Sequence, residues 1–152
     1  MRGSSVRAGT AVIVAIMMGL AIPALADHRL TEGRNPKVGA ALYADACAAC
    51  HGARLEGQPD WRVPGPDGVL PAPPHDATGH TWHHDTPMLL AYTLDGGQAT
   101  LAARGVTGFT SGMPAFRDAL TEDQVLDILA YIRASWPPQA QVFQRERTHA
   151  QH

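Results

Sequence analysis

The chain has 152 residues, with 12 Lys or Arg against 14 Asp or Glu, and its formal net charge is −2. This length fits one domain with short extensions, not two domains. A mildly acidic balance gives no sign of nucleic-acid binding and says little about any other partner.

The first 26 residues have the features of an export signal. Arg2 and Arg7 precede an apolar run at 11–20, and a small-x-small cleavage sequence follows at 24–26. An uncleaved membrane anchor is the alternative, because the apolar run approaches the length that spans a bilayer. We expect a cleaved signal over 1–26, and therefore a periplasmic protein.

A first helix is predicted from Asn35-Pro36 to His51-Gly52. Asn is a favoured N-cap residue, and Pro is favoured at the first helical position. Apolar residues then recur at helical spacing, namely Val38, Leu42, Ala46 and Ala49. The helix therefore delivers the residues at its C-terminal end to one place.

That end carries Cys47-Ala48-Ala49-Cys50-His51, and C-x-x-C-H is the attachment pattern of a c-type haem. Cys47 and Cys50 can each bond one vinyl group of the porphyrin, and His51 can bind its iron.

A thioredoxin-like dithiol is disfavoured because strand-like alternation is scarce. A zinc site is disfavoured because His80 lies much farther along the chain than a zinc-finger ligand would. A structural disulfide is less favoured still, since closing so short a loop removes little conformational entropy from the unfolded chain.

Residues 53–80 are rich in Pro and Gly and show no regular periodicity. So long a loop is unusual in a compact domain, but it can wrap a flat apolar cofactor. Asp85-Thr86-Pro87 then begins a second helix, which Gly96-Gly97 ends. A loop of small residues is predicted from 100 to 112.

The last helix is the most clearly marked of the three. It begins with a capping box at 121–124, and Pro137-Pro138 ends it. Its apolar stripe consists of Val125, Ile128, Leu129, Ile132 and Trp136. For residues 139–152 we expect a polar, flexible C-terminal tail.

A sixth iron ligand can be sought among the two methionines that remain after signal removal. Met88 lies in the first turn of an amphipathic helix, where packing in the core is the ordinary role. Met113 lies before Pro114, which favours an extended backbone and holds the thioether away from helical packing. We predict Met113 as the distal ligand, with a histidine in its place as the alternative. His/Met ligation raises the reduction potential and suits electron transfer, so we expect no small-molecule substrate.

The segments 39–43, 47–52, 112–116 and 129–132 together resemble a class I c-type cytochrome of the monohaem, bacterial periplasmic type. The resemblance implies an all-α cytochrome c fold over 27–138. In this fold, three main helices and long loops surround one covalently bound haem c.

Two packing features also follow from the resemblance. The first and last helices should cross near Gly39 and Tyr131. A proline carbonyl should accept a hydrogen bond from the second nitrogen of the proximal imidazole. The candidates for this carbonyl are Pro71, Pro73 and Pro74.

The function implied is one-electron transfer between redox protein partners, with no catalysis by the chain itself and with docking to a membrane respiratory complex as an option. The alternatives are a haem c subunit of a larger dehydrogenase or oxidase, a haem peroxidase, or a copper-handling protein. The copper alternative depends on the histidine-rich segment, which we define as His75, His80, His83 and His84. A helix would place the last three on one face. We favour a solvated segment, with Trp82 packed beside the haem or its propionates.

Overall fold

The computed structural model describes residues 30 and 32–150, and the predicted export signal at 1–26 lies outside them. In this part of the chain the structure is helical, and its β pairing consists of one isolated bridge between Val69 and Thr110. The predicted all-α fold is confirmed. None of the described helices is both long enough and apolar enough to cross a membrane.

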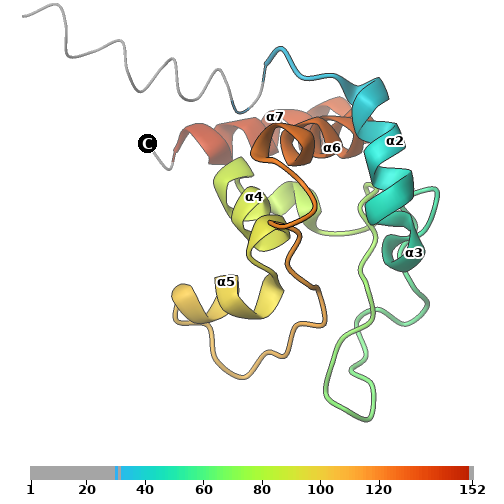
Figure 1. Ribbon diagram of the computed structural model, residues 1–152, viewed down its shortest axis with the longest axis vertical. Coiled ribbons are helices and arrows are strands. Elements are labelled where there is room, and N and C mark those ends of the chain that lie inside the picture. Colours follow the sequence, from blue (N-terminus) through green and yellow to red (C-terminus); the bar gives the residue numbers. More distant parts are fainter. Residues whose placement is uncertain (1–29, 31, 151–152) are drawn as a thin grey trace, which may run out of the picture.

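The first predicted helix is divided in two, as α2 (Pro36–Ala46) and the single turn α3 (Ala48–His51). Helix α2 crosses α6 (Glu122–Ala134) at the top of the molecule (Figure 1). Gly39 lies so close to the Asp127 carbonyl oxygen that a Cβ atom would overlap it. The rings of Tyr43 and Tyr131 meet at a centroid distance of 5.4 Å. The predicted crossing near Gly39 and Tyr131 is confirmed.

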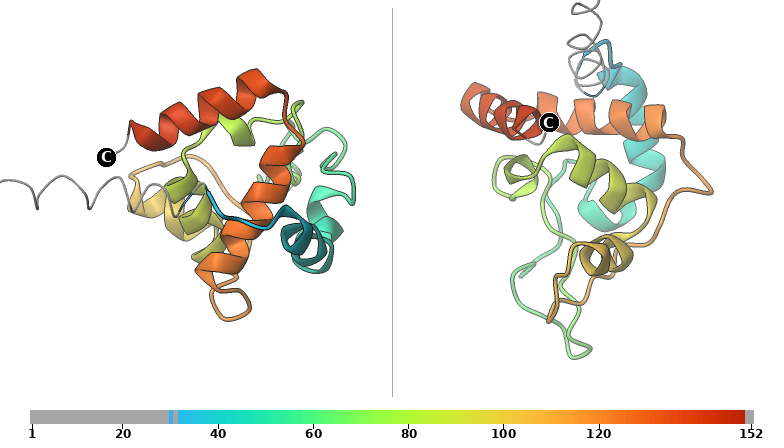
Figure 2. Two further views of the ribbon diagram at one scale, coloured as in Figure 1. Left: turned by 90° about the horizontal axis from the view of Figure 1, so that it is seen from above. Right: turned by 90° about the vertical axis from the view of Figure 1, so that its left-hand side faces the viewer.

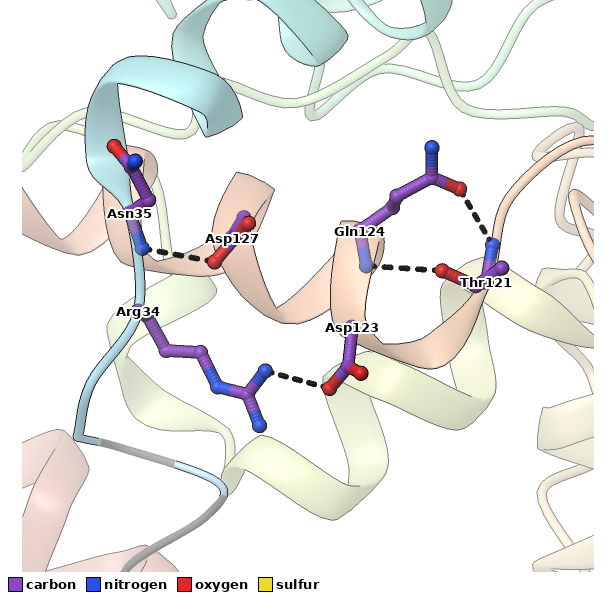
Figure 3. A network of polar contacts seen from close by, with 6 residues as sticks. All are labelled: Arg34, Asn35, Thr121, Asp123, Gln124 and Asp127. Atoms are coloured by element: carbon purple, nitrogen blue, oxygen red, sulfur yellow. Dashed lines mark hydrogen bonds and ion pairs between the residues drawn. The ribbon is translucent and has the colours of Figure 1, made fainter.

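Polar contacts attach the start of α2 to α6 (Figure 3). The Arg34 guanidinium donates to the Asp123 carboxylate at 2.7 Å, and the backbone amide of Asn35 donates to Asp127 Oδ1 at 2.8 Å. The predicted capping box is present, because Thr121 and Gln124 each accept a hydrogen bond from the other's backbone amide. Backbone amides at the start of each helix are therefore hydrogen-bonded to side chains close to the crossing point.

The second predicted helix is α4 (Thr86–Leu94), and Asp85 caps it by accepting from the Met88 amide at 2.7 Å. A further helix, α5 (Gly97–Ala103), begins where we predicted a helix end and a loop. Gly96 separates the two with a φ of +85°, a conformation that favours glycine. The glycine pair therefore turns the chain between helices, and the predicted loop from residue 100 is wrong for its first four residues.

The chain after Pro137 also differs from the prediction. In place of the predicted flexible tail, residues 138–149 form helix α7 (Pro138–His149), which contacts the short 3₁₀ helix η1 (Thr81–His83) and α4. Figure 2 shows α7 leaving α6 at an angle. Three of its residues, Ala140, Gln144 and Thr148, are buried. The helix is polar in sequence because its contacts with the domain are hydrogen bonds as well as apolar packing.

The apolar core lies among α2, α4, α6 and the start of α7, with Tyr43, Leu94, Val125, Ile128, Ile132 and Trp136 among its buried members. The loops at 53–80 and 104–120 extend to the same side of the helices (Figure 1). The bridge between Val69 and Thr110 joins these loops. The helices thus form a frame from which both loops extend.

Candidate haem site

The two cysteines lie on either side of one helical turn. Cys47 interrupts the helix between α2 and α3, and its carbonyl accepts the amides of Cys50 and His51 at 3.1 and 2.9 Å. Both thiols are free, and Cys50 is exposed whereas Cys47 is half-buried. Burial, followed by the neighbouring Cys50, raises the pKa of Cys47 to about 11. Two free thiols on one turn provide what two thioether bonds to a porphyrin require.

The imidazole of His51 is buried, with 7% of its surface exposed. Its Nδ1 lies 2.9 Å from the carbonyl oxygen of Pro73. A carbonyl can only accept, so Nδ1 carries the proton and Nε2 of the neutral ring keeps a free lone pair. Burial lowers the pKa of His51, although the bond to Pro73 acts in the opposite direction. This ring is therefore prepared to bind a metal through Nε2.

The loop after α3 folds back to place Pro73 beside His51. The Gly57 amide donates to the carbonyl of His51 at 2.8 Å, and the Gln58 amide donates to that of Ala72 at 2.9 Å. The Gln58 side chain accepts the Ala72 amide in return at 3.2 Å. Of the three prolines that the sequence left open, the structure selects Pro73.

A second histidine lies against the ring of His51. The His75 ring stacks on it with centroids 4.0 Å apart and planes 24° apart. Burial, followed by the neighbouring His51 and His80, lowers the pKa of His75 well below its ordinary value. Sequence analysis placed His75 with the other histidines and missed this contact. Its position two residues after Pro73 was the available signal.

Met113 is half-buried in the loop that leads from α5 to α6. Its carbonyl accepts the Gly97 amide at 3.1 Å, and its own amide donates to Ser111 Oγ at 3.3 Å. Gly112 lies close to Val69, since an added Cβ atom would be 2.9 Å from the valine Cγ1. The loop that carries Met113 therefore packs against the loop that follows His51. Met88 lies in α4, as predicted.

The histidine-rich segment does not gather on a helical face. His80 stacks on Trp61 and contacts the edge of His84, whereas His83 packs against Trp82 and Phe143 of α7. Residues 81–83 form only a 3₁₀ turn, so the helical i, i+3, i+4 alignment on which the copper alternative depends is not formed. Residues 30 and 32–150 contain no group of three or more His, Cys, Asp or Glu that could hold a metal ion.

The donors around α3 fit a haem. They comprise two unpaired thiols and an imidazole whose tautomer leaves Nε2 free, and long loops extend beside them. A family model described as cytochrome c matches residues 37–136. The chain belongs to the cytochrome c family. Covalently bound haem c and haem-based electron transfer follow from this membership.

A curated protein is similar in sequence to this cytochrome. The chain is 33% identical over 110 residues to the gluconate 2-dehydrogenase cytochrome c subunit of Pantoea cypripedii. The match covers 70% of this chain and 22% of that protein, so the cytochrome spans only a small part of its relative. No solved structure matches the chain significantly.

Proposed function

We propose that this cytochrome is a periplasmic one-electron carrier whose haem is bonded to Cys47 and Cys50 and ligated by His51 and Met113. The observation that carries the proposal is the 2.9 Å contact from His51 Nδ1 to the Pro73 carbonyl. It orients the imidazole, leaves Nε2 free and makes the ring a stronger donor.

In this proposal each residue of the site has a separate role in holding the haem. Cys47 and Cys50 attach the porphyrin, so the cofactor cannot dissociate. His51 supplies a nitrogen donor that Pro73 holds in one tautomer. Met113 supplies a thioether, which stabilises ferrous over ferric iron and leaves no open position for small molecules. The haem, when bound, accepts and donates one electron at its iron. The chain itself then needs no catalytic residue.

We further propose that the partners are redox proteins and that one of them is a dehydrogenase. The support is the similarity to a protein named as a dehydrogenase cytochrome subunit. Mixing the ferric protein with membranes, with and without gluconate as electron source, tests this pairing. Substrate-dependent appearance of the reduced haem spectrum supports it. Absence of reduction with gluconate and with other sugar acids contradicts it.

The periplasmic location rests on the export sequence at 1–26, which lies outside the described residues. Cleavage there gives a haem protein that begins at Asp27. The intact mass of the protein from the periplasmic fraction measures this directly. A mass that retains the first 26 residues would favour the membrane-anchored alternative.

The ligand set is tested by Met113→Ala, with Met88→Ala as the matched control. Met113→Ala should abolish the near-infrared sulfur-to-iron band and lower the reduction potential by on the order of 100 mV, within the roughly 0.8 V that axial ligands control. It should also let carbon monoxide bind the ferrous protein quickly. Met88→Ala should retain the near-infrared band, the reduction potential and the slow binding of carbon monoxide.

Two outcomes would contradict the proposal. An unchanged band and potential in Met113→Ala would remove Met113 from the ligand set. Rapid carbon monoxide binding to the unaltered protein at neutral pH would show an accessible iron and favour the peroxidase alternative.

A further inference from the structure

The face of the His51 ring is covered by a side chain that the proposed ligand set does not use. His75 lies parallel to His51, with ring centroids 4.0 Å apart and an interplanar angle of 24°. Two flat rings in this arrangement leave no room for one of them to rotate alone. The orientation of His51 is therefore tied to that of His75.

The ring of His75 is itself fixed on its other sides. Its Nδ1 lies 2.8 Å from the Thr81 hydroxyl, and the Tyr43 ring meets it in a T-shaped arrangement at a centroid distance of 6.2 Å. Thr81 is buried in η1, so this hydroxyl cannot move away easily. The hydrogen bond to Thr81 fixes the plane of the His75 ring. Because the two rings stack, the plane of the His51 ring is then fixed as well.

The backbone of His75 is held just as firmly. Its amide donates to the Leu55 carbonyl at 2.8 Å, and its carbonyl accepts Trp136 Nε1 at 2.7 Å. Leu55 belongs to the loop after α3, whereas Trp136 follows α6. His75 thus joins the loop that carries Pro73 to the helical frame.

An imidazole bound to iron through Nε2 can still turn about the bond to the metal. The contact with Pro73 restricts this turn at one atom only, at Nδ1. A flat neighbour against the whole ring restricts it much more strongly. We propose that His75 is a positioning residue that fixes the plane in which the His51 imidazole meets the iron. This inference rests on His51 being the proximal ligand, which is part of the proposed function.

The prediction concerns the ferric holoprotein in solution. The plane of the axial imidazole determines how unpaired electron density is distributed over the porphyrin, and so sets the spread of the four haem methyl resonances. A ring that samples several planes averages this distribution. His75→Leu should therefore narrow the spread of the methyl resonances. His75→Phe keeps a flat ring but loses the hydrogen bond to Thr81, so it should narrow the spread less than His75→Leu does.

Two further variants make the test specific. Thr81→Val removes the hydrogen bond that sets the plane of His75, and it should narrow the spread in the same direction. His80→Leu replaces an exposed histidine that stacks on Trp61, so it should leave the methyl resonances unchanged. Midpoint potentials of all four variants provide a second readout.

The outcomes separate this inference from the proposed function. If His75→Leu matches the unaltered protein, or if His80→Leu changes as much, His75 has no positioning role. If His75→Leu fails to retain haem, an unchanged spectrum of Thr81→Val overturns the inference instead. The intact mass and near-infrared band of the unaltered protein test the haem and its ligands independently of His75.

Discussion

Gly39 of α2 lies directly against the backbone carbonyl of Asp127 in α6. A methyl group at this position would overlap the carbonyl oxygen, and backbone atoms on both sides leave no flexible side chain to yield. The two helices can therefore approach this closely only because residue 39 has no Cβ atom. Since α3 follows α2 after one residue, the crossing also positions the haem-binding turn.

Gly39→Ala should lower the free energy of unfolding by about 1–3 kcal/mol, the usual cost of overpacking. Guanidinium unfolding of the holoprotein measures the loss. Ala41→Ser, on an exposed position of the same helix, should cost about 0.5 kcal/mol or less. Equal stability of Gly39→Ala and the unaltered protein would show that the helices can separate without penalty.

Thr148 of α7 is fully buried and accepts the Thr86 amide at 3.1 Å. This amide opens α4, so it has no partner within its own helix. Thr148→Val should leave it unsatisfied and lower the free energy of unfolding by about 1–3 kcal/mol. Thr107→Val, on an exposed loop residue, is the control and should change stability little. If both variants unfold alike, α7 contributes nothing to the stability of the domain.

Covalent attachment depends on both thiols. Cys47→Ala together with Cys50→Ala should give a chain whose mass lacks the haem, because no other cysteine exists. Each single variant should keep one thioether bond and shift the pyridine haemochrome band. Ala49→Ser, between the thiols, should retain the full haem mass. Haem mass that persists in the double variant would refute thioether attachment.

The partly buried His84 should contribute to a fall in stability in mild acid. Burial lowers the pKa of His84, neighbouring cations act in the same direction, and only Asp85 opposes them. As the pH falls below the ordinary value of about 6.5, the unfolded chain takes up a proton that the folded chain resists. The free energy of unfolding therefore decreases, by at most about 1.4 kcal/mol per pH unit for this group.

This dependence can be measured by unfolding the holoprotein between about pH 7.5 and 5.5. His84→Gln should flatten the decrease, since glutamine does not titrate. Thr107→Val, at an exposed loop position with no titratable side chain, is the control and should keep the slope of the unaltered protein. A slope that His84→Gln leaves intact would assign the acid sensitivity to other groups.

Some of the fold could be predicted because its causes are local. The Asn35 cap and the Thr121–Gln124 capping box are hydrogen bonds within four residues, and both are present. The helices α5 and α7 were missed because their support is not local. The Thr100 hydroxyl donates to the Ala91 carbonyl at 3.1 Å, and Gln144 and Thr148 bond to Thr86. No pattern within either segment reveals those partners.

The order of residues along the chain was enough to determine that two thiols and an imidazole share one turn at 47–51, because that grouping requires only helical geometry. Tertiary structure alone decided that the Pro73 carbonyl accepts the hydrogen bond from His51 Nδ1 and that His75 covers the ring. Both contacts join residues 22 or more positions apart, 51 with 73 and 51 with 75. The path of the intervening loop sets such contacts, and this path depends on hydrogen bonds that no local periodicity encodes.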